Sequence, residues 1–361
     1  MYRKTSLKIN VDNYIKNCDS FVSYTGKKMM AIIKADAYGL GDYIMGQYLE
    51  KHGVEFFGVS SLEEALRLRN HNIKSDILIL SYVHDIDLCK KNNFSVIIPN
   101  ELFIEEHKEN LKDLRVHIKI NTGLNRLGIN SDHLKKVIDE LNKYGAKVEG
   151  VMTHFACAED KDITEKHFNK FKKAVVDSEY NFKYIHTSAS DAAFSIKDDI
   201  SNYIRLGVGF LGTTSFDEEH PLHNVVSLDA EIIDCKTIPE GDGVSYHHRY
   251  KSDGKGYYLT CAIGYADGLD TNMSGKEVYV QGEIGTIVGT VCMDLIIVKV
   301  NKPYEVGSTV EIIGEHMPLT RRVKETGKIA QCITTNITDR VPRQYFVNGK
   351  LDKEVSSRFS N

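Results

Sequence analysis

The chain has 361 residues, which is enough for two domains with sizeable hydrophobic cores. Hydrophobic residues make up 42% and charged residues 27%, which is typical of a globular protein. The 46 Lys and Arg against 50 Asp and Glu give a net charge of −4. That balance provides no bulk attraction to nucleic acid or to an anionic membrane surface.

The beginning of the chain has no signal-peptide hydrophobic region, because Met1–Ser6 leads directly into the alternating Leu7, Ile9 and Val11. Apolar runs such as Met29–Ile33 are far too short to span a bilayer. The seven cysteines are widely spread and form no C-x-x-C pair, which argues against a disulfide framework and against a zinc ribbon. We therefore expect a cytoplasmic protein with reduced cysteines.

Eight short, β-rich apolar runs recur through residue 212, with polar, helix-period stretches between them. Most runs are apolar on both faces, as in parallel strands that are covered on both sides. They are Met29–Lys34, Phe56–Val59, Ile77–Leu80, Ser95–Ile98, Val116–Asn121, Val148–His154, Tyr184–Thr187 and Tyr203–Gly207. This alternation predicts an α/β fold, a (β/α)₈ TIM barrel, with a doubly wound open sheet as the alternative.

Several of the stretches between these runs have sequence patterns that are typical of helices. Ser61-x-x-Glu64 has the pattern of a capping box at the start of a helix. Amphipathic stripes at i, i+3, i+4 and i+7 are formed by Leu134, Val137, Ile138 and Leu141, and a second stripe by Phe168, Phe171 and Val175.

The pattern changes after His220-Pro221, where short strands are separated by glycine-containing turns such as Gly241-Asp242-Gly243 and Asn348-Gly349. The expected strands are Val225–Ile233, Tyr257–Ile263, Glu277–Gln281, Ile284–Val291, Leu295–Val300 and Thr309–Ile313. Leu319–Gly327 has the pattern of a short helix. The sequence thus predicts a barrel over residues 1–222 and an all-β domain over residues 223–361.

Polar side chains close several of the apolar runs of the barrel. They are Lys34, Lys119, His154, His186 and Arg205, and Ser190 follows the seventh run. Charged groups at the ends of buried strands are costly unless they are paired or functional. Because barrel enzymes place their chemistry at the C-terminal ends of the strands, this set predicts an active site there.

Gly207–Gly212 matches G-x-G-x-x-G, a weak signal for dinucleotide binding. It follows the eighth strand rather than the first, and no long helix follows it, so a Rossmann site is the less favoured interpretation. Barrels often bind phosphate at the loops after strands seven and eight. Ser190, Gly207 and Val208 therefore indicate a monophosphate cradle. A lysine that can form a Schiff base, together with such a cradle, indicates pyridoxal phosphate.

Eight ordered motifs along nearly the whole chain resemble those of the bacterial alanine racemases, which are fold-type III pyridoxal phosphate enzymes. They are Lys34-Ala35-Asp36-Ala37-Tyr38-Gly39, Lys119-x-x-Thr122-Gly123-x-x-Arg126-Leu127-Gly128, Thr153-His154-Phe155, Arg205-x-Gly207, Ser245-Tyr246, Ile263-Gly264-Tyr265-Ala266-Asp267-Gly268, Cys292-Met293-Asp294 and Arg340-Val341-Pro342-Arg343. The resemblance implies a racemase that interconverts L- and D-alanine for peptidoglycan precursors.

The resemblance also implies a role for each matching residue. Lys34 would hold the cofactor and serve one face of the substrate, and Tyr246 would serve the other face. Both residue types ordinarily have pKa values too high for a base at neutral pH, so they need help from neighbouring charges. The remaining cofactor ligands would be Tyr38, His154, Ser190, Arg205, Gly207 and Val208, and the substrate ligands Arg126, Tyr265, Met293 and Asp294.

Two further properties follow from the resemblance alone. In many relatives the residue equivalent to Lys119 is carboxylated, which turns a clash with Arg126 into an ion pair. The family also forms homodimers in which Tyr246, Met293 and Asp294 complete the barrel site of the partner subunit. We expect no metal, because the adjacent His247 and His248 rarely converge on one ion without further ligands.

Asp339 departs from the family pattern, since alanine racemases commonly have a tyrosine there. An aspartate is smaller and accepts hydrogen bonds, so it would leave room for the hydroxymethyl group of serine. A serine or dual alanine/serine racemase is therefore an alternative, and an ion pair with Arg340 or Arg343 is the structural explanation of the same residue. Less favoured are a non-catalytic pyridoxal phosphate carrier, which would lack the β domain and Tyr246, and a decarboxylase, which would place a cysteine at the second face.

Overall fold

The computed structural model describes residues 3–214 and 222–356 and divides the chain into two compact units. One unit holds the barrel and the other holds the β domain, and each is described by itself. The change of pattern predicted at His220-Pro221 lies outside the described residues.

Eight parallel strands form a closed barrel, which confirms the predicted fold. They are β2 (Lys28–Ile32), β3 (Phe56–Val59), β4 (Asp76–Ile79), β5 (Ser95–Ile98), β6 (Arg115–Asn121), β8 (Lys147–Met152), β9 (Tyr184–Ala189) and β10 (Tyr203–Leu206). Neighbouring strands pair in parallel, and pairing of β5 with β6 closes the ring. The interior is filled by side chains that include Met30, Phe56, Leu78 and Met152. The short strand β7 (Ile129–Asn130), which the sequence did not predict, pairs beside β6.

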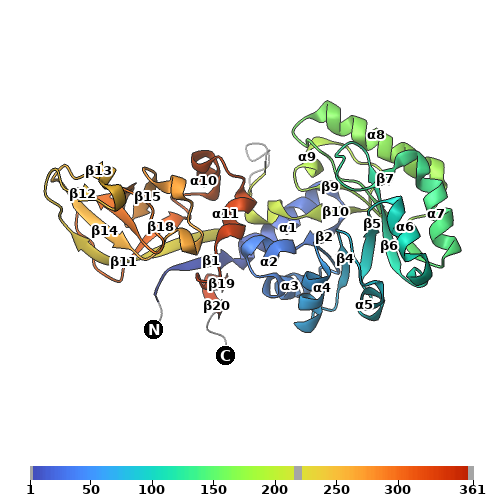
Figure 1. The fold of residues 1–361 in the computed structure, drawn as a ribbon, viewed down its shortest axis with the longest axis horizontal. Helices are drawn as coiled ribbons and strands as arrows, with labels where there is room; N and C mark the ends of the chain where they lie inside the picture. The colour runs from blue at the N-terminus through green and yellow to red at the C-terminus, as the bar shows by residue number, and fades with distance from the viewer. Residues whose placement is uncertain (1–2, 215–221, 357–361) are drawn as a thin grey trace. The chain divides into compact units, whose positions relative to one another are not determined.

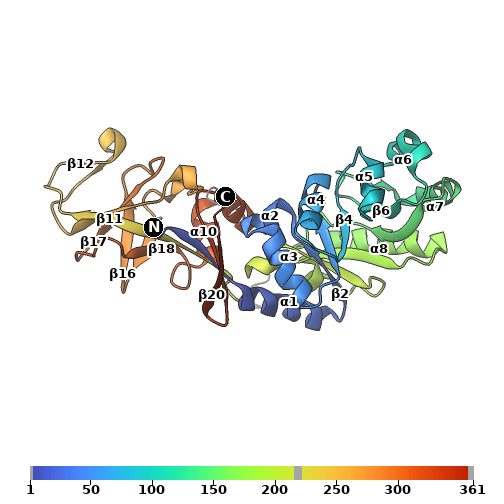
Figure 2. The ribbon, with the colours of Figure 1, turned by 90° about the horizontal axis from the view of Figure 1, so that it is seen from below.

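Helices ring these strands, as Figures 1 and 2 show. They are α1 (Val11–Thr25), α2 (Lys34–Gly39), α3 (Asp42–Lys51), α4 (Leu62–Asn70), α5 (Ile86–Lys91), α6 (Glu101–His107), α7 (Leu134–Lys143), α8 (Lys161–Ser178) and α9 (Ala192–Ser195). The Ser61 side chain caps α4 by accepting from the Glu64 N–H. The predicted stripe of α7 is buried, whereas its polar residues face outward.

The second unit is built on a nine-stranded, mostly antiparallel sheet in the order β14-β17-β16-β15-β18-β11-β1-β19-β20, in which β14 also pairs with β11. Its strands are β1 (Ser6–Asn10), β11 (Val226–Lys236), β14 (Tyr257–Cys261), β15 (Glu277–Val280), β16 (Glu283–Val288), β17 (Ile296–Val300), β18 (Thr309–Ile313), β19 (Arg343–Val347) and β20 (Lys350–Val355). A separate pair is formed by β12 (Gly243–Val244) and β13 (Tyr250–Lys251).

The first strand of the chain differs from the predicted domain division. We assigned residues 1–222 to the barrel, but β1 lies in the sheet of the β domain, between β11 and β19. Leu7 and Ile9 are fully buried in that sheet. Val11 does not continue the strand, because α1 begins there. An alternating strand carries no information about which sheet it will join, so composition alone could not place it.

Two features complete the β domain. The Asn348-Gly349 turn joins β19 to β20, and both residues have positive φ (51° and 71°), which is the backbone of a type I′ hairpin turn. The helices α10 (Leu319–Thr326) and α11 (Ala330–Asn336) lie between β18 and β19 in the chain. The sequence indicated only α10.

Candidate active site

Lys34 lies two residues after the end of β2 and opens a turn with an unusual backbone. Ala35, Asp36, Ala37 and Tyr38 all have left-handed conformations, with φ between 51° and 59°. Four consecutive non-glycine residues in this region cost roughly 1–2 kcal/mol each, so the surroundings must hold the turn in place. Such strain is typical of a functional segment.

The left-handed turn brings the Tyr38 side chain to the loop after β10. A Cβ atom on Gly207 would lie 2.3 Å from the Tyr38 hydroxyl oxygen, so a larger residue there would displace the Tyr38 ring. The Ser190 hydroxyl, fixed just after β9, accepts from the N–H groups of Gly207 (3.2 Å) and Gly209 (3.0 Å). Val208 opens the short 3₁₀ helix that follows. The structure thus brings Tyr38, Ser190, Gly207 and Val208 together.

Arg205 is buried on β10, and both of its Nη atoms are fully used. They donate to the carbonyl oxygens of His186, Thr153 and Thr187, each at 2.8 Å. They also lie 3.1 Å from Nδ1 of His154 and from Nδ1 of His186. Because arginine can only donate, both histidines accept at Nδ1 and carry their proton on Nε2. Burial and the charge of Arg205 lower the pKa of His154 to about 3, so it is neutral at physiological pH.

The Nε of Arg205 has no acceptor within the described part of the chain. Burial lowers the pKa of Arg205 to about 10, which still leaves it charged at neutral pH. The guanidinium is therefore held rigidly and has one donor to spare, which suits a basic ring nitrogen.

Three further cations, Lys34, Lys119 and Arg126, lie near the Arg205 guanidinium. Burial, together with Arg126 and Arg205, lowers the pKa of Lys34, and the Glu64 carboxylate raises it. Burial and the charges of Arg205, Arg126 and Lys34 lower the pKa of Lys119 to about 8. Lys119 is 5% exposed, and no acceptor within residues 3–214 and 222–356 bonds its amine. Arg126 is exposed and likewise makes no hydrogen bond or ion pair to a described residue.

The β domain gathers the other predicted residues on three loops. The Ser245 hydroxyl donates to the Thr290 carbonyl (2.9 Å) and lies 3.3 Å from the Cys292 sulfur. The N–H groups of Tyr265 and Ala266 donate to the carbonyls of Cys292 (3.0 Å) and Met293 (2.9 Å). Tyr246, Met293 and Tyr265 are thereby brought near one another, and all three side chains are largely exposed.

Asp294 and Asp339 lie close to a chain of arginines in the same domain. The Arg340 guanidinium donates to Asp294 (2.6 Å) and lies 3.4 Å from the buried Asp267, which Arg3 also binds. Arg343 donates to the carbonyls of Ile337 and Val341. Asp339 is exposed, beside these pairs.

The position of His186 differs from what the sequence suggested. His186 is the third residue of β9 rather than its last, and its Nε2 donates to Nδ1 of His117 inside the barrel (2.8 Å). Sequence reasoning missed His117. The proton of His117 is then on Nε2, which is buried and has no partner. The only available signal was a histidine inside a run of buried residues on β6.

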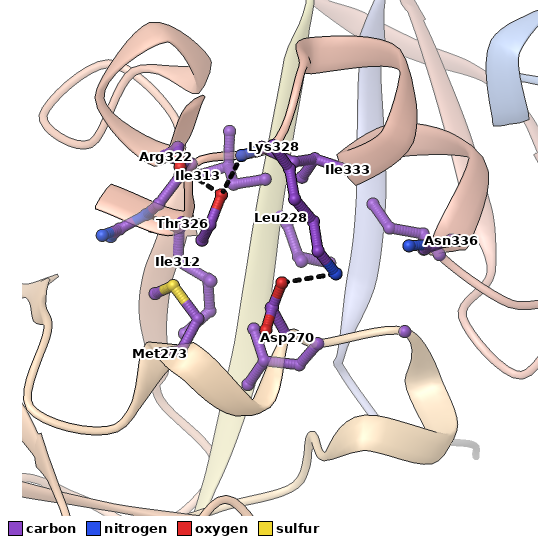
Figure 3. A pocket seen from close by; sticks show the side chains of 13 residues that line it. Leu228, Asp270, Met273, Ile312, Ile313, Arg322, Thr326, Lys328, Ile333 and Asn336 are labelled. Carbon is purple, nitrogen blue, oxygen red and sulfur yellow. Dashed lines mark hydrogen bonds and ion pairs between the residues drawn. The ribbon is translucent and has the colours of Figure 1, made fainter. Parts of the chain in front are cut away.

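A separate cavity lies within the β domain, between α10, α11 and the loop of Asp270 and Met273 (Figure 3). Apolar side chains line most of it, and among the lining residues Lys328 lies 2.6 Å from the Asp270 carboxylate. Its volume of about 30 Å³ accommodates one or two water molecules. None of the strand-end residues lines it, so we do not assign the chemistry to it.

The barrel with a strand-end lysine, a glycine-lined cradle and a rigid arginine, followed by a β domain, defines a class of pyridoxal phosphate enzyme. Comparison with known families identifies the class more closely. The family model "Alanine racemase, N-terminal domain" matches residues 9–215, and "Alanine racemase, C-terminal domain" matches residues 225–345. The chain belongs to the alanine racemase family.

Individual relatives agree with this assignment. The chain is 34% identical over 366 residues to an alanine racemase of Staphylococcus carnosus, covering 95% of each protein. Its structure is similar to that of the alanine racemase of Clostridium difficile 630, with a TM-score of 0.92, 30% identity and 99% of each chain covered. It is also similar to an alanine racemase from Bartonella henselae with covalently bound pyridoxal phosphate (TM-score 0.88, 25% identity, 96% and 100% covered).

Two further observations concern membrane insertion and metal binding. Across the described residues, no helix is both long and apolar enough to cross a membrane. In the same ranges, no group of three His, Cys, Asp or Glu is placed to hold a metal ion.

Proposed function

We propose that this protein interconverts L- and D-alanine with pyridoxal phosphate as its cofactor. The observation that carries the proposal is Lys34, which stands at the end of β2 among Arg205, Lys119 and the Ser190–Gly207 cradle. The residues fit the cofactor: an amine for its aldehyde, a glycine-lined loop for its phosphate and the spare Nε–H of Arg205 for its ring nitrogen. When bound, pyridoxal phosphate withdraws electrons from the substrate and acidifies its α-proton.

Racemisation needs a proton acceptor on one face of the substrate and a donor on the other. Lys34 Nζ serves one face and Tyr246 Oη the other. The lowered pKa of Lys34, caused by burial and by Arg126 and Arg205, increases the neutral fraction of its amine near physiological pH. Only the neutral amine can accept a proton.

Arg205 tunes the cofactor without titrating. A ring nitrogen that accepts from Arg205 stays unprotonated, because arginine keeps its proton. The electron-withdrawing power is then moderate, which limits side reactions such as transamination. Tyr38, Ser190, Gly207 and Val208 bind the phosphate, and His154, fixed by Arg205, packs against the ring.

The substrate carboxylate binds Arg126, whose guanidinium has no partner among the described residues. The Met293 backbone, Asp294 and Tyr265 complete the substrate site from the β domain. The exposure of Tyr246, Tyr265 and Met293 supports a second proposal: in a homodimer, these residues of one subunit complete the barrel site of the other.

Lys119 is proposed to carry a carboxylate made from CO₂. Its buried amine lies among three cations, and a pKa of about 8 gives it a much larger neutral fraction near physiological pH than an ordinary lysine has. The neutral amine adds to the carbon of CO₂ and releases a proton, which yields the carbamate. The resulting anion would balance Arg126. Carbon-13 NMR of the enzyme in ¹³C-bicarbonate should show a carbamate signal that is missing in Lys119→Met. A wild-type spectrum without that signal would contradict the proposal.

The free cysteines suit a reducing compartment, and we infer that the reaction takes place in the cytoplasm, where it supplies D-alanine for peptidoglycan precursors. The function is tested by α-proton exchange in D₂O with L-alanine, L-serine and bulkier amino acids. Fast exchange of alanine is expected. Serine that equals or exceeds alanine would favour the alternative of a serine or dual racemase. No exchange of any of them by an enzyme with bound cofactor would overturn the racemase function.

The homodimer is tested by mixing Lys34→Ala with Tyr246→Phe. If sites are shared, some mixed dimers contain one intact site and recover activity. No recovery despite demonstrated subunit exchange would contradict the shared site.

A further inference from the structure

Glu64 does not make the contact that its sequence pattern predicts. In a capping box, its carboxylate would return to the N–H of Ser61. Instead, Oε1 accepts from the N–H of Ala35 (2.7 Å), and Oε2 accepts from the N–H of Ser60 (2.6 Å). The first turn of α4 is thus tied to the peptide that immediately follows Lys34.

The Ala35 N–H that Glu64 bonds belongs to the strained, left-handed part of the backbone. Ala35 is the first of the four left-handed residues. Its N–H lies in the first turn of α2, where a helix offers no carbonyl oxygen of its own as an acceptor. Ser60 follows β3, the neighbouring strand in the barrel. One carboxylate therefore joins the ends of β2 and β3 at the position from which the Lys34 side chain extends.

A second contact from α4 secures the rest of the turn. Arg67, one helical turn after Glu64, lies 3.1 Å from the Asp42 carboxylate and 3.4 Å from that of Asp36. Asp36 also accepts from the N–H of Asp42 (3.1 Å). These groups hold the middle and the end of the turn, whereas Glu64 alone bonds its first N–H.

The charge of Glu64 is also distinctive. Among the described residues, Arg126 and Arg205 lower the pKa of Lys34 and Glu64 raises it, and Lys119 is a further cation whose own pKa Lys34 lowers. Glu64 is the one anion of this group. Its effect on Lys34 is therefore opposite to that of the two arginines.

We propose that Glu64 is a positioning residue for Lys34, which fixes the strained turn after the lysine through the Ala35 and Ser60 N–H groups and so places a carboxylate next to the lysine. This inference rests on the proposed function for its catalytic consequence. In each turnover, Lys34 Nζ must return to the same place to receive or deliver a proton. A displacement of about 1 Å can cost about 100-fold in rate, so a loosened turn should lower kcat more than it raises KM.

Three substitutions separate position from charge. Glu64→Gln keeps one acceptor but turns an NH₂ group toward the second N–H, and it removes the charge. Glu64→Asp keeps the charge but is one methylene too short to reach both N–H groups. Glu63→Gln is the matched control, because Glu63 stands in the same turn of α4, is exposed and makes no contact with the Lys34 turn.

We expect kcat for L-alanine to fall about 10- to 100-fold in Glu64→Gln and in Glu64→Asp, with KM changed less than threefold, and to stay within twofold in Glu63→Gln. In Glu64→Gln the acidic limb of the kcat–pH profile should move to lower pH, since the anion that favours the protonated amine is gone. In Glu64→Asp the limb should stay in place. A loss of kcat in Glu64→Gln with no shift of the limb would leave Glu64 with a merely structural role.

A readout without turnover distinguishes failure of this inference from failure of the proposed function. The rate at which holoenzyme loses pyridoxal phosphate to excess hydroxylamine should rise at least fivefold in Glu64→Gln and remain unchanged in Glu63→Gln. If the wild type holds the cofactor but does not racemise alanine, the proposed function fails while this release test still decides the inference. Should Glu64→Gln fail to fold, Glu64→Asp takes its place in the release test. If the Glu64 variants behave like Glu63→Gln, the inference is overturned.

Discussion

The barrel and the β domain contribute to the candidate site in opposite ways. In the barrel, Lys119, Arg205 and Ser190 are 5%, 3% and 2% exposed, and hydrogen bonds fix the side chains of Arg205 and Ser190. In the β domain, Tyr246 is 66% exposed and Met293 52%. Their backbones are firmly tied, but their side chains face solvent.

This difference shows that the side chains of the barrel site are preorganised within their own domain, whereas those of the β domain are not. Groups fixed in a buried, low-dielectric site act strongly on developing charge without reorganisation. An exposed tyrosine lacks that advantage until another surface covers it. The contrast supports the proposal that Tyr246 works only where a barrel site covers it, and the four predictions below test this division of roles.

The largest effect is expected for Lys34→Ala. In the proposed mechanism, loss of the amine removes both the covalent attachment of the cofactor and one proton acceptor, so kcat for either enantiomer should fall at least about 10⁴-fold. The absorbance of the bound cofactor should change as well. Lys28→Ala is the control, because Lys28 is an exposed lysine at the start of β2, and it should retain wild-type activity. Substantial activity in Lys34→Ala would remove the central role assigned to the barrel.

Tyr246→Phe should lower kcat about 10²- to 10⁴-fold, because the hydroxyl is the only group removed. Cofactor binding and its absorbance should be unchanged, since the barrel holds the cofactor. Stopped-flow and steady-state rates with both enantiomers measure this, and Tyr257→Phe on β14 is the control. If the cofactor is lost together with activity, the division between the two domains is wrong.

Much of the barrel could be predicted, because both faces of its strands are buried and their composition shows it. Ser95–Ile98 and Phe56–Val59 were located with the bounds that the structure has. The strand-end lysines, Arg205 and Ser190 were found for the same reason: polar residues stand out at the ends of apolar runs.

The features that were missed depend on three-dimensional contacts. The left-handed backbone from Ala35 to Tyr38 has no glycine to mark it. Glu64 matches a local capping motif, and its use by a residue 29 positions earlier is a tertiary override of that motif. The pairing of β1 with β11 and β19 is likewise set by packing rather than by local pattern.

A smaller effect is expected for Asp339→Tyr, which restores the residue common among alanine racemases. A larger side chain leaves less room for a hydroxymethyl group, so the ratio of kcat/KM for serine to that for alanine should fall about 3- to 10-fold. Parallel exchange measurements with both amino acids give this ratio. An unchanged ratio, with an intact fold, would mean that Asp339 does not set the preference between alanine and serine.

The smallest effect concerns stability and follows from the buried, unpaired charge of Lys119. Its pKa is lowered to about 8 in the folded protein by burial and by Arg205, Arg126 and Lys34, whereas a lysine in the unfolded chain titrates near 10.5. Below pH 8 both states hold the proton, and the burial penalty is fully present. Between pH 8 and 10.5 the unfolded state binds more protons, so stability should rise with pH.

In CO₂-free buffer, this contribution should raise the melting temperature of the wild type by a few degrees at most between pH 7.5 and 9.5, relative to Lys119→Met. Lys112→Met, an exposed lysine of the same domain, should follow the wild type. Added bicarbonate should stabilise the wild type and not Lys119→Met, because a carboxylated lysine replaces a repelled cation by an anion among cations. Parallel curves for wild type and Lys119→Met under both conditions would mean that Lys119 is neither strained by its neighbours nor modified. The positive charges around Lys119 in the barrel site would then have to be balanced by the substrate carboxylate alone.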